Sequence, residues 1–219
     1  MNTPLSTFSE RELAMKKAIH EFIQMRLGGE VVPPDLEILL TAFSERRDFA
    51  ENKENPLACV GAELMWMAGT YPLLDHNYLS ERDWADADIM ANVRAMQDTD
   101  KKLKFVLQHE DTSLLGYWQP SPELPLNCCA LFWLDTEGQY RIAEGNTLAE
   151  TLAYRALAEG DEDACFAVTQ VYEQLGISIP KIEDDILFDG MEAREAAVSE
   201  TPQDYRSLRF ERHQRVSDL

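Results

Sequence analysis

The stretch that decides the fold begins with LKFVLQHE at residues 103–110 and continues, after a polar turn, with LLGYWQ at residues 114–119. A loop with three prolines then leads to CCALFWL at residues 128–134, and a DTEG turn leads to QYRIA at residues 139–143. Short runs rich in aromatic, β-branched and leucine residues, separated by turn residues, indicate β-strands. Four such runs predict a meander that needs helices packed against it.

Details of these runs predict how the strands lie. In the first run, Phe105, Leu107 and His109 are expected on one face because side chains alternate along a strand. Gly116 inside the second run indicates a bulge or the close approach of another backbone. The run at residues 128–134 is apolar on both faces, which predicts a central strand. Gly138 ends the DTEG turn, where a left-handed residue is needed.

The segments on either side of these runs are predicted to be helical. Apolar residues recur at helical spacing from the capping box Ser9–Glu12, from Pro34, from Ser80 and from the capping box Thr147–Glu150. Residues 57–68 are apolar nearly all round, which predicts a helix buried between others. We therefore expect one α+β domain: a helical part at 1–100, the sheet and following helices at 101–190, and a poorly ordered or helical tail at 191–219. Its antiparallel or mixed sheet should have about four to six strands, within residues 103–143.

Composition narrows the functional class. The chain has 219 residues, 45% of them hydrophobic, and a formal net charge of −20. Such an acidic surface repels phosphate backbones, which argues against direct nucleic-acid binding. It favours a basic partner by electrostatic steering, or it serves solubility alone. No apolar run is long enough for a membrane span, no secretory signal is evident, and the four cysteines lack CxxC spacing and are expected to be reduced core residues. A cytoplasmic location is expected.

Catalytic patterns are missing from the sequence. It contains no nucleophile elbow, phosphate-cradling loop, dinucleotide fingerprint or HExxH helix. His109, Glu110 and Asp111 form a tempting cluster, but neighbours in a strand face opposite ways. Asp83, Asp86 and Asp88 suit the first turns of a helix, with a bound cation as the alternative reading. We therefore expect no enzyme activity, no cofactor and no metal.

Aromatic residues have two readings. Trp66 and Trp133 are expected in the core, because tryptophan buries a large apolar area. Tyr117 and Trp118 follow a strand glycine beside the proline loop. Both are core residues in one reading, and one of them is an exposed partner contact in the other.

Three motifs resemble those of the SUKH superfamily, the cell-wall-assembly-regulator-like fold. They are LLGYW at residues 114–118, ALFWLDTEGQY at residues 130–140 and GNTLAETL at residues 145–152. They match the family's "GYW" strand, its D-x-E-G turn and its helix start over about 50 residues. The resemblance implies an α+β fold with helices around a sheet. Most bacterial members neutralise toxins by binding them, and other members are cytoplasmic scaffolds. The resemblance therefore also implies a role in binding another protein.

These observations together predict a cytoplasmic immunity protein that binds a basic toxin domain. The residues expected to contact the partner are Tyr117 and Trp118 as anchors and a set of acids: Asp161, Glu162, Asp163, Asp184 and Asp185. A regulatory or scaffold module that binds a host protein is the second hypothesis. An enzyme that uses a cation at Asp83, Asp86 and Asp88, or at Asp184 and Asp185, is the third.

Overall fold

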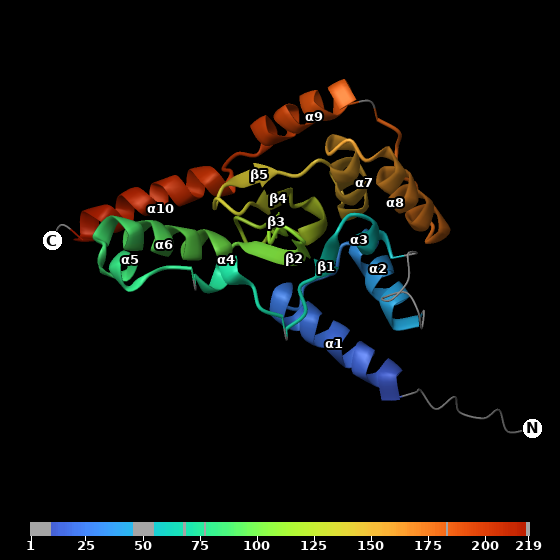
Figure 1. Ribbon diagram of the computed structural model, residues 1–219, viewed down its shortest axis with the longest axis horizontal. Helices are drawn as coiled ribbons and strands as arrows, with labels where there is room; N and C mark the ends of the chain where they lie inside the picture. The colour runs from blue at the N-terminus through green and yellow to red at the C-terminus, as the bar shows by residue number, and fades with distance from the viewer. Residues whose placement is uncertain (1–9, 46–54, 68, 77, 183, 218–219) are drawn as a thin grey trace, which may run out of the picture.

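A computed structural model describes residues 10–45, 55–67, 69–76, 78–182 and 184–217, with the side chains of 184–185 and 216–217 left undescribed (Figure 1). The predicted α+β fold is confirmed: helices surround an antiparallel sheet of five strands in the order β1-β2-β3-β4-β5. The strands are β1 (Ala62–Leu64), β2 (Leu103–His109), β3 (Leu114–Trp118), β4 (Leu131–Leu134) and β5 (Tyr140–Ile142). The edge strand β1 lies outside the predicted range of 103–143.

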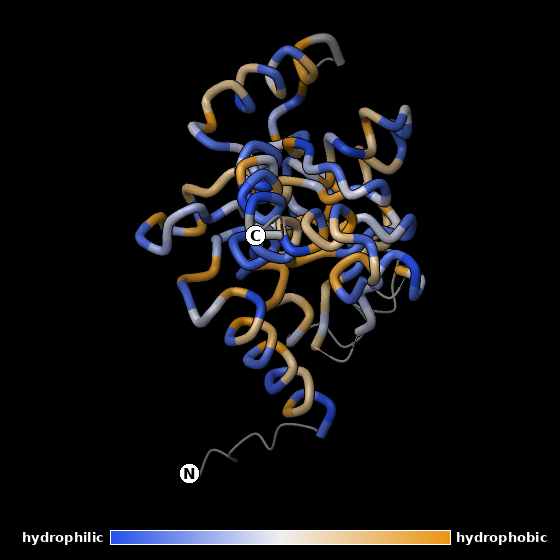
Figure 2. The backbone as a smooth tube through the Cα atoms, turned by 90° about the vertical axis from the view of Figure 1, so that its left-hand side faces the viewer, coloured by the Kyte–Doolittle hydropathy of each residue, from blue (hydrophilic) through white to orange (hydrophobic). Residues whose placement is uncertain are grey.

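Ten helices form in the described ranges. Before the sheet come α1 (Glu10–Arg26), α2 (Pro34–Glu45), α3 (Pro56–Cys59), α4 (Pro72–Asp75), α5 (Glu81–Ala85) and α6 (Ala87–Asp100). After it come α7 (Leu148–Ala158), α8 (Glu162–Gln174), α9 (Asp184–Ala197) and α10 (Pro202–Ser217), and a 3-10 turn η1 (Leu126–Cys128) precedes β4. Figure 2 shows polar and apolar residues alternating along α1, which projects from the body of the molecule toward the N-terminus.

The sheet separates two apolar clusters. One face packs against α1, α2, α3, α7 and α8 through residues such as Val106, Leu115 and Trp133. The other face packs against α4, α6 and the C-terminal segment through residues such as Phe105, Trp118 and Phe132. Both faces of β3 are therefore covered, and all five of its residues are buried. Apolar burial on both sides is the main stabilising contribution to such a layered fold.

A bulge in β2 changes the predicted facing of its side chains. Phe105 pairs with Gly116 and Leu107 pairs with Leu115, so Val106 is an extra residue in β2. Phe105 and Leu107 consequently belong to opposite clusters, and the prediction that they share a face is wrong. Gly116 meets the expected close approach: an added Cβ would lie 3.0 Å from the backbone of Phe105.

The helix predicted over residues 57–68 is wrong. Helix α3 ends at Cys59, and Gly61 adopts a left-handed φ of 59°, which ends the helical path. The next residues form β1, which pairs with His109 and its neighbours in β2. An apolar run suits a buried strand as well as a buried helix. Hydrogen bonding to β2 at the edge of the sheet therefore decides the structure of these residues.

Helix caps follow the sequence signals closely. Ser80 and Asp83 form a complete capping box at α5, and Thr147 accepts a hydrogen bond from the Glu150 amide at α7. The helix predicted from Ser80 is divided at Asp86 into α5 and α6. The Asp86 carboxylate caps α6 by accepting hydrogen bonds from the amides of Asp88 and Ile89. Ser9, the predicted cap of α1, lies outside the described residues. Gly138 has the expected left-handed φ of 75°.

The C-terminal segment forms two helices. Helix α10 lies along α6 (Figure 1), where His213 Nε2 is 3.0 Å from an Asp98 carboxylate oxygen. Arg206 hydrogen-bonds both the Asn92 side chain and the Gly138 carbonyl oxygen, so it ties α10 to α6 and to the turn before β5. Residues 202–217 therefore adopt the helical alternative of the predicted tail.

Candidate protein-binding cleft

The two aromatic residues expected to anchor a partner lie inside the protein. Tyr117 is 3% exposed and Trp118 is 1% exposed. Tyr117 packs in the cluster that includes α7 and α8, and the Trp118 ring makes an edge contact with Tyr205 at 5.8 Å between centroids. The expectation that one of them is exposed is wrong, because helices cover both faces of β3.

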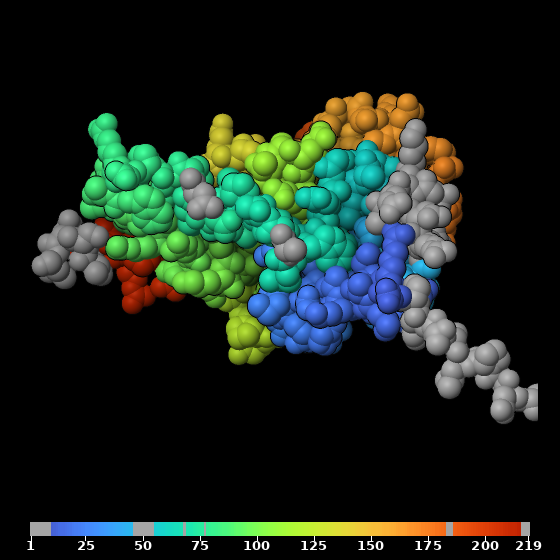
Figure 3. Space-filling model, turned by 60° about the horizontal axis from the view of Figure 1, so that its bottom comes forward, coloured from blue at the N-terminus to red at the C-terminus, as the bar shows by residue number. Residues whose placement is uncertain are grey.

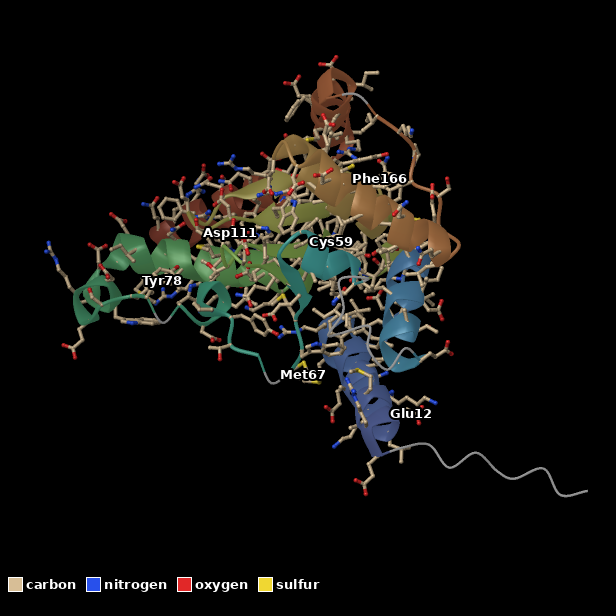
Figure 4. The ribbon with its side chains drawn as sticks, turned by 45° about the vertical axis from the view of Figure 1, so that its right-hand side comes forward. Glu12, Cys59, Met67, Tyr78, Asp111 and Phe166 are labelled. Carbon is tan, nitrogen blue, oxygen red and sulfur yellow. The ribbon has the colours of Figure 1, made fainter. Side chains whose placement is uncertain are left out.

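The expected acidic contacts at α8 are exposed. Asp161 caps α8 by accepting a hydrogen bond from the Ala164 amide, and Glu162 and Asp163 follow in its first turn. Phe166 lies one turn further on α8 and is 63% exposed (Figure 4). An exposed aromatic ring beside carboxylates is a suitable contact for a basic, partly apolar surface. The side chains of Asp184 and Asp185 lie outside the described set.

A cleft of about 440 Å³ lies between the end of the sheet and helices α7 and α9. Its walls come from the β2–β3 turn, from β4, β5 and the turn between them, and from the two helices. Phe188 and Met191 of α9 and Trp133 of β4 provide its apolar lining. Phe188 is about half exposed, whereas its neighbour Leu187 is buried and fixes α9 to the core.

The cleft is acidic. Five carboxylates line it, namely Asp111, Asp135, Glu137, Glu144 and Glu159, together with two arginines. Both arginines are already paired: Arg141 with Asp135 at 3.1 Å, and Arg155 with Glu144 at 3.3 Å and Glu159 at 2.5 Å. The net charge of the lining is therefore negative, and no lining arginine is unpaired to attract an anion.

Glu144 is the polar centre of this cleft. It is only 5% exposed and accepts a 2.8 Å hydrogen bond from the Trp133 indole. The Arg155 guanidinium stacks over the same indole at 5.3 Å. Burial alone would lower the pKa of Arg155, but the charges of Glu144 and Glu159 outweigh it and raise that pKa. The Arg194 guanidinium donates to the carbonyl oxygens of Ala143 and Glu144, which holds α9 against the end of β5.

More than half of the chain's net negative charge lies in the segment that contains α7, α8 and α9. Residues 144–200 contain fourteen acids and three bases, a net charge of −11 out of the total of −20. Two of those bases, Arg155 and Arg194, are engaged in the contacts just described. The sequence showed the overall charge and the acids of α8. It did not reveal Trp133, Glu144, Arg155 and Phe188 as one site, because they come from β4, the loop after β5, α7 and α9.

The clusters considered as alternative catalytic or cation-binding sites make local contacts instead. His109 Nδ1 is 3.0 Å from Asp111, at the β2–β3 turn. Asp83 and Asp86 cap helices, as described above. No group of three or more histidine, cysteine or acidic side chains is placed to hold a metal ion within the described ranges. Cys129 is buried and Cys59 and Cys165 are half-buried, whereas Cys128 is exposed, contrary to the expectation that all four are core residues.

Comparison with protein-family models, curated proteins and solved structures gave no match. None of the helices described here is long and apolar enough to cross a bilayer.

Proposed function

We propose that this protein binds a basic protein domain through the cleft beneath α9, and that it acts in the cytoplasm as an immunity protein that neutralises a toxin. The cleft carries this proposal. It combines an indole floor, an exposed phenylalanine and five carboxylates, three of which pair with the two lining arginines. Such a lining suits a lysine or arginine side chain that projects from a partner, since the alkyl stem packs on the rings and the charge meets carboxylates.

The charge distribution supports a fast encounter with such a partner. A net charge of −11 over residues 144–200 produces a field that attracts a basic surface before contact. Phe166 and Phe188 provide apolar contacts beside that charge, and buried aromatic anchors slow dissociation. The proposed role is binding rather than catalysis, and the resemblance to the SUKH superfamily supports the same role.

The test is binding to the product of the gene adjacent to this one. The two proteins are co-expressed and co-purified, and the dissociation constant is measured at about 50 and 300 mM salt. Electrostatic steering predicts that association slows as salt rises. Glu137→Lys and Phe188→Ala should each weaken binding about tenfold or more. Glu123→Lys, an equal charge reversal in the loop between β3 and β4, should leave binding within about threefold, because it lies outside the lining.

Cell survival gives the second readout. Cells that express the adjacent product should survive with the wild-type protein and lose protection with Glu137→Lys. Absence of a complex with that product, or a complex that all three variants form equally well, would reject the proposal. Stable capture of a housekeeping protein by the same cleft would instead favour the scaffold hypothesis.

A further inference from the structure

A second cleft of about 440 Å³ lies where the C-terminal end of α1 meets α4, α6 and β2. Figure 3 shows the face of the molecule that carries α1, in blue, and α6, in green. None of its lining residues is shared with the cleft beneath α9. It is therefore independent of the proposed protein-binding surface.

This second cleft is basic although the protein is strongly acidic. Arg26, Lys101 and Lys104 line it, and Asp100 is the one carboxylate in its lining. Lys101 is paired with Asp98 at 2.9 Å, outside the lining. Arg26 and Lys104 form no ion pair with any carboxylate in the described part of the chain. Two cations without a direct ion pair thus line one cleft in a chain with twice as many acids as bases.

The fold holds Arg26 in position and brings Lys104 close to the end of α1. The Arg26 Nε donates a 3.0 Å hydrogen bond to the Met65 carbonyl oxygen, and its guanidinium lies 4.6 Å from the centroid of the Tyr71 ring. Lys104 extends from β2 toward the end of α1, where its Nζ lies 3.7 Å from the position that a Cβ on Gly28 would occupy. Charges that are placed in advance bind a ligand at a lower entropic cost.

The remaining walls are apolar apart from Gln97 of α6. Leu103 and Phe105 of β2 are buried in the sheet, and Leu74 of α4 and Met25 of α1 add to the apolar part of the lining. Met25 is 67% exposed, so an apolar rim lies open to solvent beside the cations. A cleft with cations at one end and an apolar wall suits a ligand that has an anionic group and an apolar body.

Asp100 repels an anion in this cleft less strongly than an ordinary ionised aspartate does. It accepts a 2.7 Å hydrogen bond from the Tyr140 hydroxyl. Burial raises its pKa to about 7, against the Tyr140 hydrogen bond and the Arg206 charge, both of which lower that pKa. A large fraction of the Asp100 side chains is therefore uncharged at neutral pH.

We propose that the cleft between α1, α4, α6 and β2 is a binding site for a small amphipathic organic anion, whose acidic group meets Arg26 and Lys104 and whose apolar body packs on Leu74, Leu103 and Phe105. A carboxylate with a medium-length hydrocarbon tail is the ligand class that fits both halves. Free phosphate has the charge without the apolar body.

The probe is 8-anilinonaphthalene-1-sulfonate, which joins a sulfonate to an aromatic body and fluoresces when it binds in an apolar site. The full-length protein should bind it with a saturable rise in fluorescence. Lys104→Gln should weaken binding at least fivefold, and Lys104→Arg should restore most of it. Lys17→Gln removes an equal charge from the exposed side of α1 and should change nothing. Octanoate should displace the probe, and inorganic phosphate at the same concentration should not.

Methyl NMR shifts locate the bound ligand, with Leu74 and Leu103 expected to move on addition of octanoate. Saturable binding that is equal in the wild type and Lys104→Gln, shifts confined to residues outside this cleft, or no saturable binding at all would overturn the proposal. Displacement by phosphate as efficient as that by octanoate would overturn the amphipathic assignment. An unchanged melting temperature in Lys104→Gln shows that any loss is not caused by unfolding.

Discussion

The indole Nε1 of Trp118 donates a 2.7 Å hydrogen bond to the main-chain carbonyl oxygen of Glu200, 82 residues later in the chain. The Tyr205 ring packs against the same indole, and the Lys102 ammonium lies 5.2 Å from the Tyr205 ring centroid. A residue at the centre of the sheet therefore fixes the start of α10. The C-terminal segment is a structural layer of the fold, which is why Trp118 is unavailable to a partner.

Trp118→Phe should destabilise the protein by about 1–2 kcal/mol, because it leaves the Glu200 carbonyl oxygen without its buried donor. Urea unfolding measures this change, and amide hydrogen exchange should increase first in α10. Trp84→Phe is the matched control, since Trp84 is about half exposed, and it should stay within about 0.5 kcal/mol. Equal losses in both variants would show that the hydrogen bond to Glu200 contributes nothing measurable.

Gly116→Ala should cost about 1–3 kcal/mol, since the new methyl group would lie 3.0 Å from the Phe105 backbone opposite the bulge. Gly190→Ala, in α9, places the same methyl group where no atom lies within 4 Å. It should stabilise the protein by up to about 1 kcal/mol through helix propensity. Thermal unfolding should show opposite signs for the two variants. A stable Gly116→Ala protein would mean that β2 and β3 can separate without cost.

Asp100→Asn should change the pH dependence of stability. The pKa of Asp100 is about 7 in the folded protein and near 3.8 in the unfolded chain, so the folded state retains a proton that the unfolded state loses. The stability that Asp100 contributes is complete below about pH 4 and is lost as the pH rises through 7. The asparagine does not ionise and still accepts from Tyr140. Asp100→Asn should therefore be more stable than the wild type at pH 8, on the order of 1–2 kcal/mol, and about equal at pH 4.

Asp98 provides a control with the opposite sign. Burial would raise its pKa, but hydrogen bonds from Lys101 and His213 outweigh burial and lower that pKa. Asp98→Asn should thus lose stability at neutral pH, and this loss should shrink as the pH falls through the lowered pKa of the wild-type carboxylate. Melting temperatures from pH 3 to pH 8 distinguish the two variants. Curves parallel to the wild type would contradict both pKa assignments.

Glu144→Gln should destabilise the fold by about 1–3 kcal/mol, since it removes a buried charge that neutralises Arg155. The amide can still accept from Trp133, so the loss reports mainly the ion pair. Glu159→Gln removes the other, more exposed partner of Arg155 and should cost less than about 1 kcal/mol. Chemical denaturation measures both. A larger loss in Glu159→Gln would show that the exposed pair dominates.

Local sequence signals were sufficient to predict features that depend on interactions between neighbouring residues. The caps at Ser80 and Thr147 and the left-handed Gly138 depend on a few neighbouring residues, and all were predicted. The meander from β2 to β5 was also predicted, because its strands are joined by short connections and carry strong apolar runs. The prediction of a helix over residues 57–68 was wrong because an apolar run is compatible with both a helix and a strand. Pairing with β2, about 45 residues later, decides it.

The amino-acid sequence alone determined the α+β class, the strand runs, the helix caps and the acidic charge, since each follows from composition or from contacts within a few residues. Only the tertiary structure decided that Tyr117 and Trp118 are internal and that Glu144, Arg155, Trp133 and Phe188 share one cleft. It also decided that Arg26 and Lys104 face another. These arrangements depend on which helix covers which face of the sheet. That choice is set by the total burial of apolar surface over distant segments, which no local pattern records.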